Sequence, residues 1–373
     1  MIVALLEPSR ILLDDPVRPS IPADCRISFW GTVYMHIDDD DRTVGAVLCA
    51  VQMDFIPTSE AQLFLPDFTP TPRISTYITA LIAGPYYSVK DTFVGKKTVP
   101  LGIYCRKSLA EHLDPEDILL ITKQGFAYFE KVFGLAYPFE KYDQIAVVDF
   151  NWGAMENIGA VTFLERLLVF RSKVTERMYL ERANVILHEM AHMWFGDLVT
   201  MQWWDDIWLN ESFAEWASYY TAEKATRFKN SWTVFNSERK NWAYRQDQLS
   251  STHPIAVDMD DLEAVKNNFD GITYAKGASV LQQLVWHVGK ENFLAGLRKY
   301  FSKHAWGNTK LHDLLVELEE TSGRDLTPWV KTWLQTAGVN TFQTKVVGRS
   351  AAEFSSSSYA VTEFCNFITH KSS

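Results

Sequence analysis

The sequence predicts an α+β fold, in which a partial N-terminal β-sheet domain precedes a mainly helical domain. β-Branched and aromatic runs separated by Gly and Asp dominate residues 1–88, which indicates strands and turns. Helix-spaced apolar residues with capping signals begin near residue 115. From 175 to 336 helical periodicity is almost continuous. We therefore expect domains at residues 1–88 and 89–339, followed by an irregular tail at 340–373.

The N-terminal region contains three apolar runs that predict strands. Residues 25–37 and 44–55 are rich in β-branched and aromatic side chains. The acidic run 38–41 between them lacks the spaced ligands of a calcium loop, so we expect a solvated turn. Residues 74–83 form a short apolar run, which indicates a buried strand.

The next segment mixes strands with one long helix. Residues 92–93 and 101–105 predict a strand pair, and 145–150 and 160–163 predict two further strands. A helix is expected over 115–133, with Asp114 as its N-cap and Pro115 at its first position.

Composition restricts the partners of this chain. The 373 residues carry a net charge of −10 without a basic stripe, which argues against nucleic acid and anionic membranes. The longest apolar stretch, 74–84, is too short to span a bilayer. Four scattered cysteines without CxxC spacing indicate reduced thiols and a cytoplasmic location. The sequence leaves the oligomeric state open.

One motif carries specific chemistry. His188 and His192 lie four residues apart, and Glu211 follows after 18 intervening residues. On a helix, this spacing places both imidazoles on one face, as two ligands of a zinc ion require. Three protein ligands leave one position open, which is typical of a catalytic zinc site. We expect one zinc ion per chain, with Glu189 as the general base.

The surroundings of the motif favour this reading over two hydrogen-bonded core histidines. Residues 179–195 are apolar nearly all round, so the helix is expected to be buried, and buried ionisable groups are costly without partners. Asp205, Asp206 and Asn210 are candidates for orienting the ligands. A tyrosine hydroxyl would suit a developing oxyanion, but spacing does not choose among 15 tyrosines.

The run Gly153–Asn157 reads GAMEN, and with HEMAH and Glu211 it resembles the M1 family of zinc aminopeptidases, the aminopeptidase N type in its actinobacterial form. The similarity extends from about residue 64 to 342. It implies a thermolysin-like, mainly helical zinc catalytic domain. It also implies that His188, His192 and Glu211 bind zinc, that Glu189 is the base, and that Tyr274 stabilises the oxyanion.

The same resemblance assigns the GAMEN segment to substrate binding. Glu156 matches the residue that binds the free α-ammonium of a peptide. Met155 matches the residue beside the first side-chain pocket, and the backbone of Gly153 and Ala154 matches the segment that pairs with substrate. Asn157 completes the motif. The implied partners are peptides with a free N-terminus.

The chain also departs from the family pattern. Only about 70 residues precede the TPRISTY segment at 71–77, and the large helical C-terminal domain of the family is absent, so the resemblance implies a chain shortened at both ends. Three alternatives to an active aminopeptidase follow. They are an inactive fragment, an epoxide hydrolase of the leukotriene A4 hydrolase type, and a thermolysin-like endopeptidase. Ala154 in place of a second glycine argues against the epoxide hydrolase, and Glu156 would have no purpose in an endopeptidase.

Overall fold

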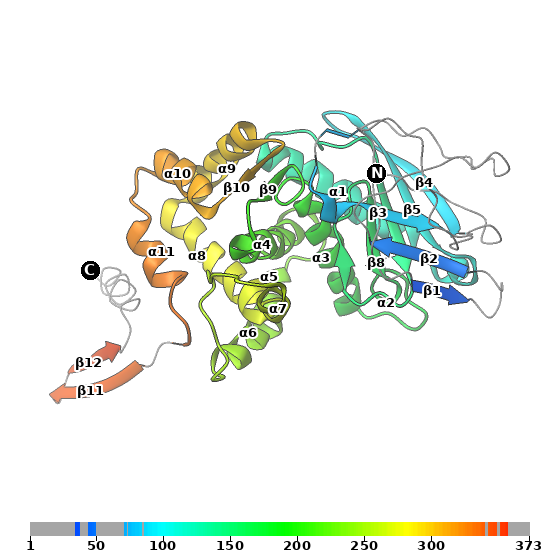
Figure 1. The fold of residues 1–373 in the computed structure, drawn as a ribbon. Coiled ribbons are helices and arrows are strands. Elements are labelled where there is room, and N and C mark those ends of the chain that lie inside the picture. Colours follow the sequence, from blue (N-terminus) through cyan, green and yellow to red (C-terminus); the bar gives the residue numbers. More distant parts are fainter. Residues whose placement is uncertain are drawn as a thin grey trace. The chain divides into compact units, whose positions relative to one another are not determined.

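A computed structural model describes residues 34–37, 44–49, 71–72, 74–83, 86–339, 342–348 and 351–356 (Figure 1). The expected turn at 38–41 and the outer parts of the runs 25–37 and 44–55 lie outside the described residues. Within the described ranges, every helix is too short or too polar to cross a membrane. The chain divides into two compact units, and α4 (Ile207–Ala225) runs through both.

A small antiparallel sheet in the first unit joins β1 (Tyr34–Ile37), β2 (Val44–Cys49) and β3 (Ala80–Ala83) in that order. The strand expected over 74–83 is confirmed only in its second half. Its first half contains a short 3-10 helix, η2 (Thr76–Ile78), and the carbonyl of Ile78 accepts a hydrogen bond from Ile158 N at 3.2 Å.

A five-stranded mixed sheet forms the body of the first unit, with the order β4-β5-β6-β8-β7. Its strands are β4 (Tyr86–Val94), β5 (Thr98–Arg106), β6 (Tyr142–Val147), β7 (Ala154–Met155) and β8 (Ala160–Leu164). The central strand β6 is buried at every residue. It ends earlier than the sequence predicts because Asp149 takes a left-handed backbone conformation, with φ of 51°.

The first long helix confirms its capping signals. α1 (Pro115–Phe133) begins after Asp114, whose carboxylate accepts from the backbone N of Asp117 at 3.3 Å. It ends at Gly134, which has φ of 79°. In the chain, η3 (Lys107–His112) lies between β5 and α1, and α2 (Glu165–Leu168) directly follows β8.

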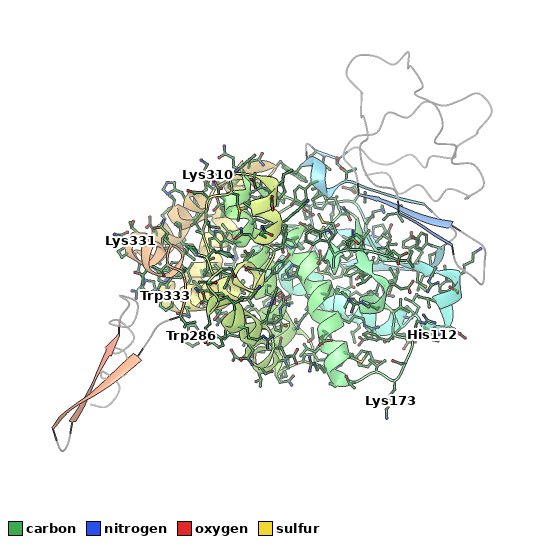
Figure 2. All side chains as sticks on the ribbon, turned by 60° about the horizontal axis from the view of Figure 1, so that its bottom comes forward. His112, Lys173, Trp286, Lys310, Lys331 and Trp333 are labelled. Atoms are coloured by element: carbon green, nitrogen blue, oxygen red, sulfur yellow. The ribbon has the colours of Figure 1, made fainter. Side chains whose placement is uncertain are left out.

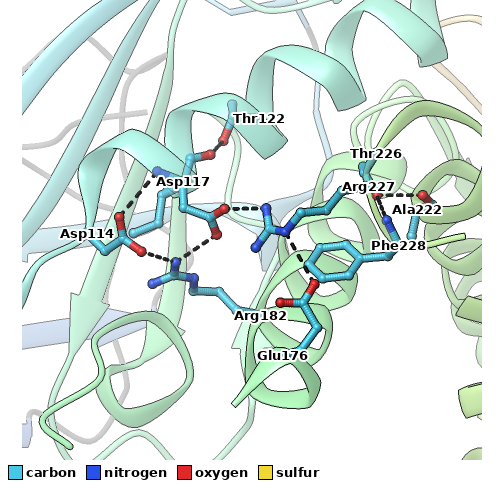
Figure 3. A network of polar contacts seen from close by, with 10 residues as sticks. Asp114, Asp117, Thr122, Glu176, Arg182, Ala222, Thr226, Arg227 and Phe228 are labelled. Atoms are coloured by element: carbon cyan, nitrogen blue, oxygen red, sulfur yellow. Dashed lines mark hydrogen bonds and ion pairs between the residues drawn. The ribbon is translucent and has the colours of Figure 1, made fainter. Parts of the chain in front are cut away.

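The second long helix, α3 (Glu176–His192), is held by a buried arginine. The Arg182 side chain is 1% exposed, and its Nη2 lies 2.6 Å from Asp114 Oδ2 and 2.8 Å from Asp117 Oδ2 (Figure 3). Its Nη1 donates to the carbonyl of Leu168 at 3.2 Å. Charge-assisted bonds therefore tie the middle of α3 to the N-terminus of α1.

A second arginine extends this network to the chain that follows α4. Arg227 Nη1 lies 2.5 Å from Asp117 Oδ1, and Arg227 Nε lies 3.4 Å from Glu176 Oε1 (Figure 3). Asp117 thus accepts from both arginines. The network holds α1, α3 and the chain that follows α4 against one another in the first unit.

The second unit is mainly helical, as expected beyond residue 175. Its helical elements are η4 (Trp204–Asp206), the first half of α4, α5 (Ser231–Ser237), α6 (Arg239–Asp247), α7 (Leu262–Asn267), η5 (Ile272–Lys276), α8 (Gly277–Val288), α9 (Lys290–His304), α10 (Leu311–Ser322) and α11 (Thr327–Trp333). The short strands β9 (Val199–Met201) and β10 (Gly307–Thr309), most of whose residues belong to the first unit, pair with each other. On α8, Trp286 is 80% exposed (Figure 2). The α+β class is thereby confirmed.

The tail expected to be irregular contains an antiparallel hairpin. Its strands are β11 (Phe342–Gly348) and β12 (Ala351–Ser356). The first strand contains Thr344, Val346 and Val347, and β-branched residues of this kind favour extended backbone over helix. The boundaries at 88 and 339 stay a prediction.

We expect Arg182→Ala to lower the free energy of unfolding by about 2–3 kcal/mol, because Asp114 loses its buried partner and Asp117 keeps only its bond to Arg227. Urea denaturation measures this. Arg177→Ala is the matched control on the same helix, since Arg177 is 63% exposed in its pair with Glu181. The control should cost less than about 1 kcal/mol. Equal costs for the two variants would contradict the structural role of Arg182.

Candidate functional site

The helix α3 brings two imidazoles together at its C-terminal end. His188 and His192 are buried, and their Nε2 atoms lie 3.1 Å apart. The two imidazole rings lie edge to face, with their centroids 4.8 Å apart. Two nitrogens bound tetrahedrally to zinc at about 2.0–2.1 Å would lie about 3.3 Å apart, so this separation suits one shared ion.

The orientation of His192 is set by the chain immediately after the helix. Its Nδ1 lies 3.2 Å from the carbonyl oxygen of Phe195. A carbonyl only accepts, so this contact requires the proton on Nδ1 and leaves a lone pair on Nε2. Two of the three candidates named from the sequence, Asp205 and Asp206, have other partners. Asp205 accepts from Met259 N and Asp206 from Leu311 N.

Glu211 completes the group expected from the sequence. It is buried on α4, and one ligand atom from each of His188, His192 and Glu211 lies within 4.8 Å of the others. Two imidazoles and one carboxylate are the donor set of many catalytic zinc sites. Glu211 is a buried carboxylate close to the nitrogen lone pairs of two imidazoles. A bound cation would offset the free-energy cost of burying it, so these residues fit a divalent metal.

Two further carboxylates accompany the imidazoles in the first unit. Glu189 is buried on α3 between the two histidines. Burial raises the pKa of the Asp197 carboxyl well above its usual range, and the charges of Glu156 and Glu189 act in the same direction. Neither carboxylate oxygen of Asp197 has a hydrogen-bond partner among the described residues. This end of α3 is therefore rich in acidic groups.

The segment 153–157 lies at the end of the five-stranded sheet, where α3 contacts β7. Leu164 N donates to the carbonyl of Gly153 at 2.9 Å, and Ala160 N donates to that of Asn157 at 3.0 Å. In an antiparallel ladder, hydrogen-bonded pairs alternate with pairs whose backbone groups point away. Ala154 pairs with Phe163 between the bonded pairs. Its N–H and C=O therefore face the outer edge of β7.

The side chains of this segment have different environments. Glu156 is buried, and its Oε1 accepts from the hydroxyl of Tyr77 at 3.4 Å. Met155 is half-buried. Asn157 is 0% exposed, and its Oδ1 accepts from Thr162 Oγ1 at 2.9 Å. The structure thus places Asn157 inside the connection between β7 and β8 rather than at the outer edge.

Tyr274 belongs to the second unit and lies in η5, a short π-helix. It is half-buried, with the rings of Trp242 and Phe269 at 6.2 and 6.5 Å. Turns of π-helix are rare and occur often at functional sites, because they redirect side chains from the regular helical path.

The residue after Glu211 is hydrogen-bonded to the residue before Tyr274. Ser212 Oγ donates to the carbonyl of Thr273 at 2.5 Å. Gly277 permits this contact, since a methyl group there would overlap Ser212 Oγ. This bond fixes α4 against η5 within the second unit.

Sequence reasoning missed Asp197, Tyr77 and Ser212. Asp197 had a usable signal, because it is the only charged residue in an otherwise apolar run after His192. Tyr77 and Ser212 had none, since each acts through a partner distant in the sequence.

The sequence of this chain is similar to those of known peptidases. The peptidase family M1 domain matches residues 119–333. Aminopeptidase N of Streptomyces lividans is 58% identical over 293 residues, which cover 78% of this chain and 34% of that protein.

Two further relatives are less similar to this chain. Tricorn protease-interacting factor F2 of Thermoplasma volcanium is 37% identical over 286 residues, which cover 76% of this chain and 35% of that protein. Aminopeptidase 2 of Candida albicans is 35% identical over 297 residues, which cover 79% of this chain and 32% of that protein. The chain therefore spans about one third of the length of these relatives.

We expect Gly277→Ala to destabilise the wild-type chain by about 1–3 kcal/mol, because the new methyl group displaces Ser212. In a Ser212→Gly background the same change should be neutral or stabilising, since Ala favours helix over Gly by about 0.8–1 kcal/mol. Urea denaturation of the four chains measures this cycle. Additive costs would show that the two side chains do not compete for space.

Proposed function

This chain belongs to the peptidase M1 family, and from that premise we propose that it is the catalytic part of a zinc aminopeptidase. It hydrolyses the first peptide bond of peptides that have a free N-terminus. The observation that carries the proposal is the buried group of His188, His192 and Glu211. The scattered cysteines support a cytoplasmic location.

The three buried residues would hold the ion through His188 Nε2, His192 Nε2 and a carboxylate oxygen of Glu211. When bound, zinc lowers the pKa of a water toward 7 and polarises the carbonyl of the scissile bond. The contact between His192 Nδ1 and the Phe195 carbonyl keeps the second imidazole in the tautomer that this role needs.

Glu189 serves as the general base. Its position directly after His188 places it about 100° around α3 from that imidazole, on the same turn. It takes the proton from the attacking water and passes it to the nitrogen of the departing peptide. Its burial supports this role, because proton transfer is more effective where bulk water does not screen the group.

Glu156 gives the enzyme its preference for an N-terminus. A buried carboxylate pairs with the α-ammonium of a peptide and rejects chains that lack one. The outward N–H and C=O of Ala154 bind the substrate backbone as an added strand, and Gly153 leaves room for its approach. Met155 borders the first side-chain pocket, and Asn157 supports the segment through Thr162.

The hydroxyl of Tyr274 donates a hydrogen bond to the oxyanion that develops on the scissile carbonyl. Its π-helical backbone and the flanking rings of Trp242 and Phe269 support a fixed orientation of its ring. The bond between Ser212 and Thr273 supports a fixed spacing between Tyr274 and Glu211 in the second unit.

The first test is hydrolysis of alanyl p-nitroanilide beside its N-acetylated form, with zinc measured on the same sample. We expect turnover of the free amine only, loss of turnover on chelation, and recovery with zinc. Glu156→Ala should reduce turnover of the free amine. Equal hydrolysis of the two anilides would refute an aminopeptidase, and a zinc-loaded chain without turnover would identify an inactive fragment.

We expect Glu189→Gln to keep one zinc ion and to lower turnover by about 100-fold or more, because the amide cannot accept the proton. Metal analysis and anilide hydrolysis measure the two effects separately. Glu181→Gln is the control, since Glu181 is an exposed glutamate on the same helix. A Glu189→Gln chain with wild-type turnover would remove the general-base assignment.

A further inference from the structure

Glu156 has a hydrogen-bond donor that comes from a distant part of the chain. The hydroxyl of Tyr77 lies 3.4 Å from Glu156 Oε1, across 79 residues of sequence. Glu156 is buried, so water screens this contact less than it would at the surface. The contact is part of the first unit.

The backbone holds the two partners in register. Ile158 N donates to the carbonyl of Ile78 at 3.2 Å, which joins the residue after Tyr77 to the connection that follows Glu156. Ile78 is fully buried, and Ala80 and Ile82 of β3 pack in one cluster with Ile145 and Ala160 of the main sheet. The segment that carries Tyr77 is therefore anchored to the sheet that carries Glu156.

This arrangement can orient a carboxylate that would otherwise rotate. The terminal torsion of glutamate is broad, so a glutamate without a partner samples many orientations. A phenol that donates to Oε1 restricts this torsion and leaves Oε2 available to another donor. Because a phenol carries no charge at neutral pH, it does not compete with an ammonium group for the negative charge.

We propose that Tyr77 is a positioning residue that orients the Glu156 carboxylate toward the α-ammonium of the substrate. This inference rests on the proposed function, in which Glu156 is the anchor for the free N-terminus. Tyr77 then strengthens recognition of the amine without touching the scissile bond, so its effect is confined to ligands that carry the amine.

The test compares two inhibitors on the zinc-loaded full chain by calorimetry. One is leucine hydroxamate, and the other is isocaproyl hydroxamate, which is the same molecule without its α-amino group. Both chelate zinc, so their affinity ratio isolates recognition of the amine. We expect Tyr77→Phe to reduce this ratio by about 10-fold, the effect of one hydrogen bond to a charged group. Binding of isocaproyl hydroxamate should change by less than about twofold.

Two variants complete the design. Tyr87→Phe is the matched control, because Tyr87 is a 42% exposed tyrosine on β4 of the same unit, and it should leave both affinities unchanged. Tyr77→Phe added to Glu156→Ala should cause no further loss, since the hydroxyl then has no carboxylate to orient.

The outcomes separate the inference from the proposed function. A wild-type chain that binds both hydroxamates alike, or neither, overturns the role of Glu156 and with it the proposed function. A Tyr77→Phe chain that keeps the wild-type ratio overturns the inference alone. Equal weakening of both inhibitors also overturns it, because Tyr77 would then support the fold rather than the anchor.

Discussion

The structure depends on two imidazole nitrogens held 3.1 Å apart inside a buried helix. Such a pair, joined by the carboxylate of Glu211, is a donor set that suits one divalent cation. The constraint explains why α3 is so firmly held. Its middle is tied to α1 through Arg182, and the chain beyond its end returns the Phe195 carbonyl to His192. The helix must keep its position within tenths of an ångström for its ligands to share one ion.

Under the proposed function, recognition of a chain end would depend on a second constraint, the geometry of an edge strand. The alternation of the ladder between β7 and β8 directs the backbone groups of Ala154 outward, while the bonds of Gly153 and Asn157 fix the strand to the sheet. A peptide added to that edge would run past Glu156. The side chain of Glu156 in turn meets Tyr77, so the acid at the edge is shaped by a segment that precedes the sheet.

The second unit contains Glu211 and Tyr274, whose helices are joined by a hydrogen bond. Glu211 on α4 and Tyr274 on η5 are close to the bond from Ser212 to Thr273, which joins their helices. A small residue at 277 keeps that contact free of steric conflict. In the proposed mechanism a metal ligand and an oxyanion donor keep a fixed spacing, and this one hydrogen bond between their neighbouring residues would help to maintain it.

The sequence by itself determined the features that follow from local periodicity. These are α1 with its Asp114 cap and the helix that places His188 and His192 on one face. The choice of Glu211 as third ligand came from its position after the HEMAH motif and from the resemblance to the M1 family. Only the tertiary structure decided that Tyr77 meets Glu156, that Ser212 meets Thr273, and that Ala154 rather than Gly153 turns its backbone outward. Helical spacing is fixed by bonds four residues apart. Contacts between residues 61 or 79 positions apart depend on how whole elements pack, which no local pattern records.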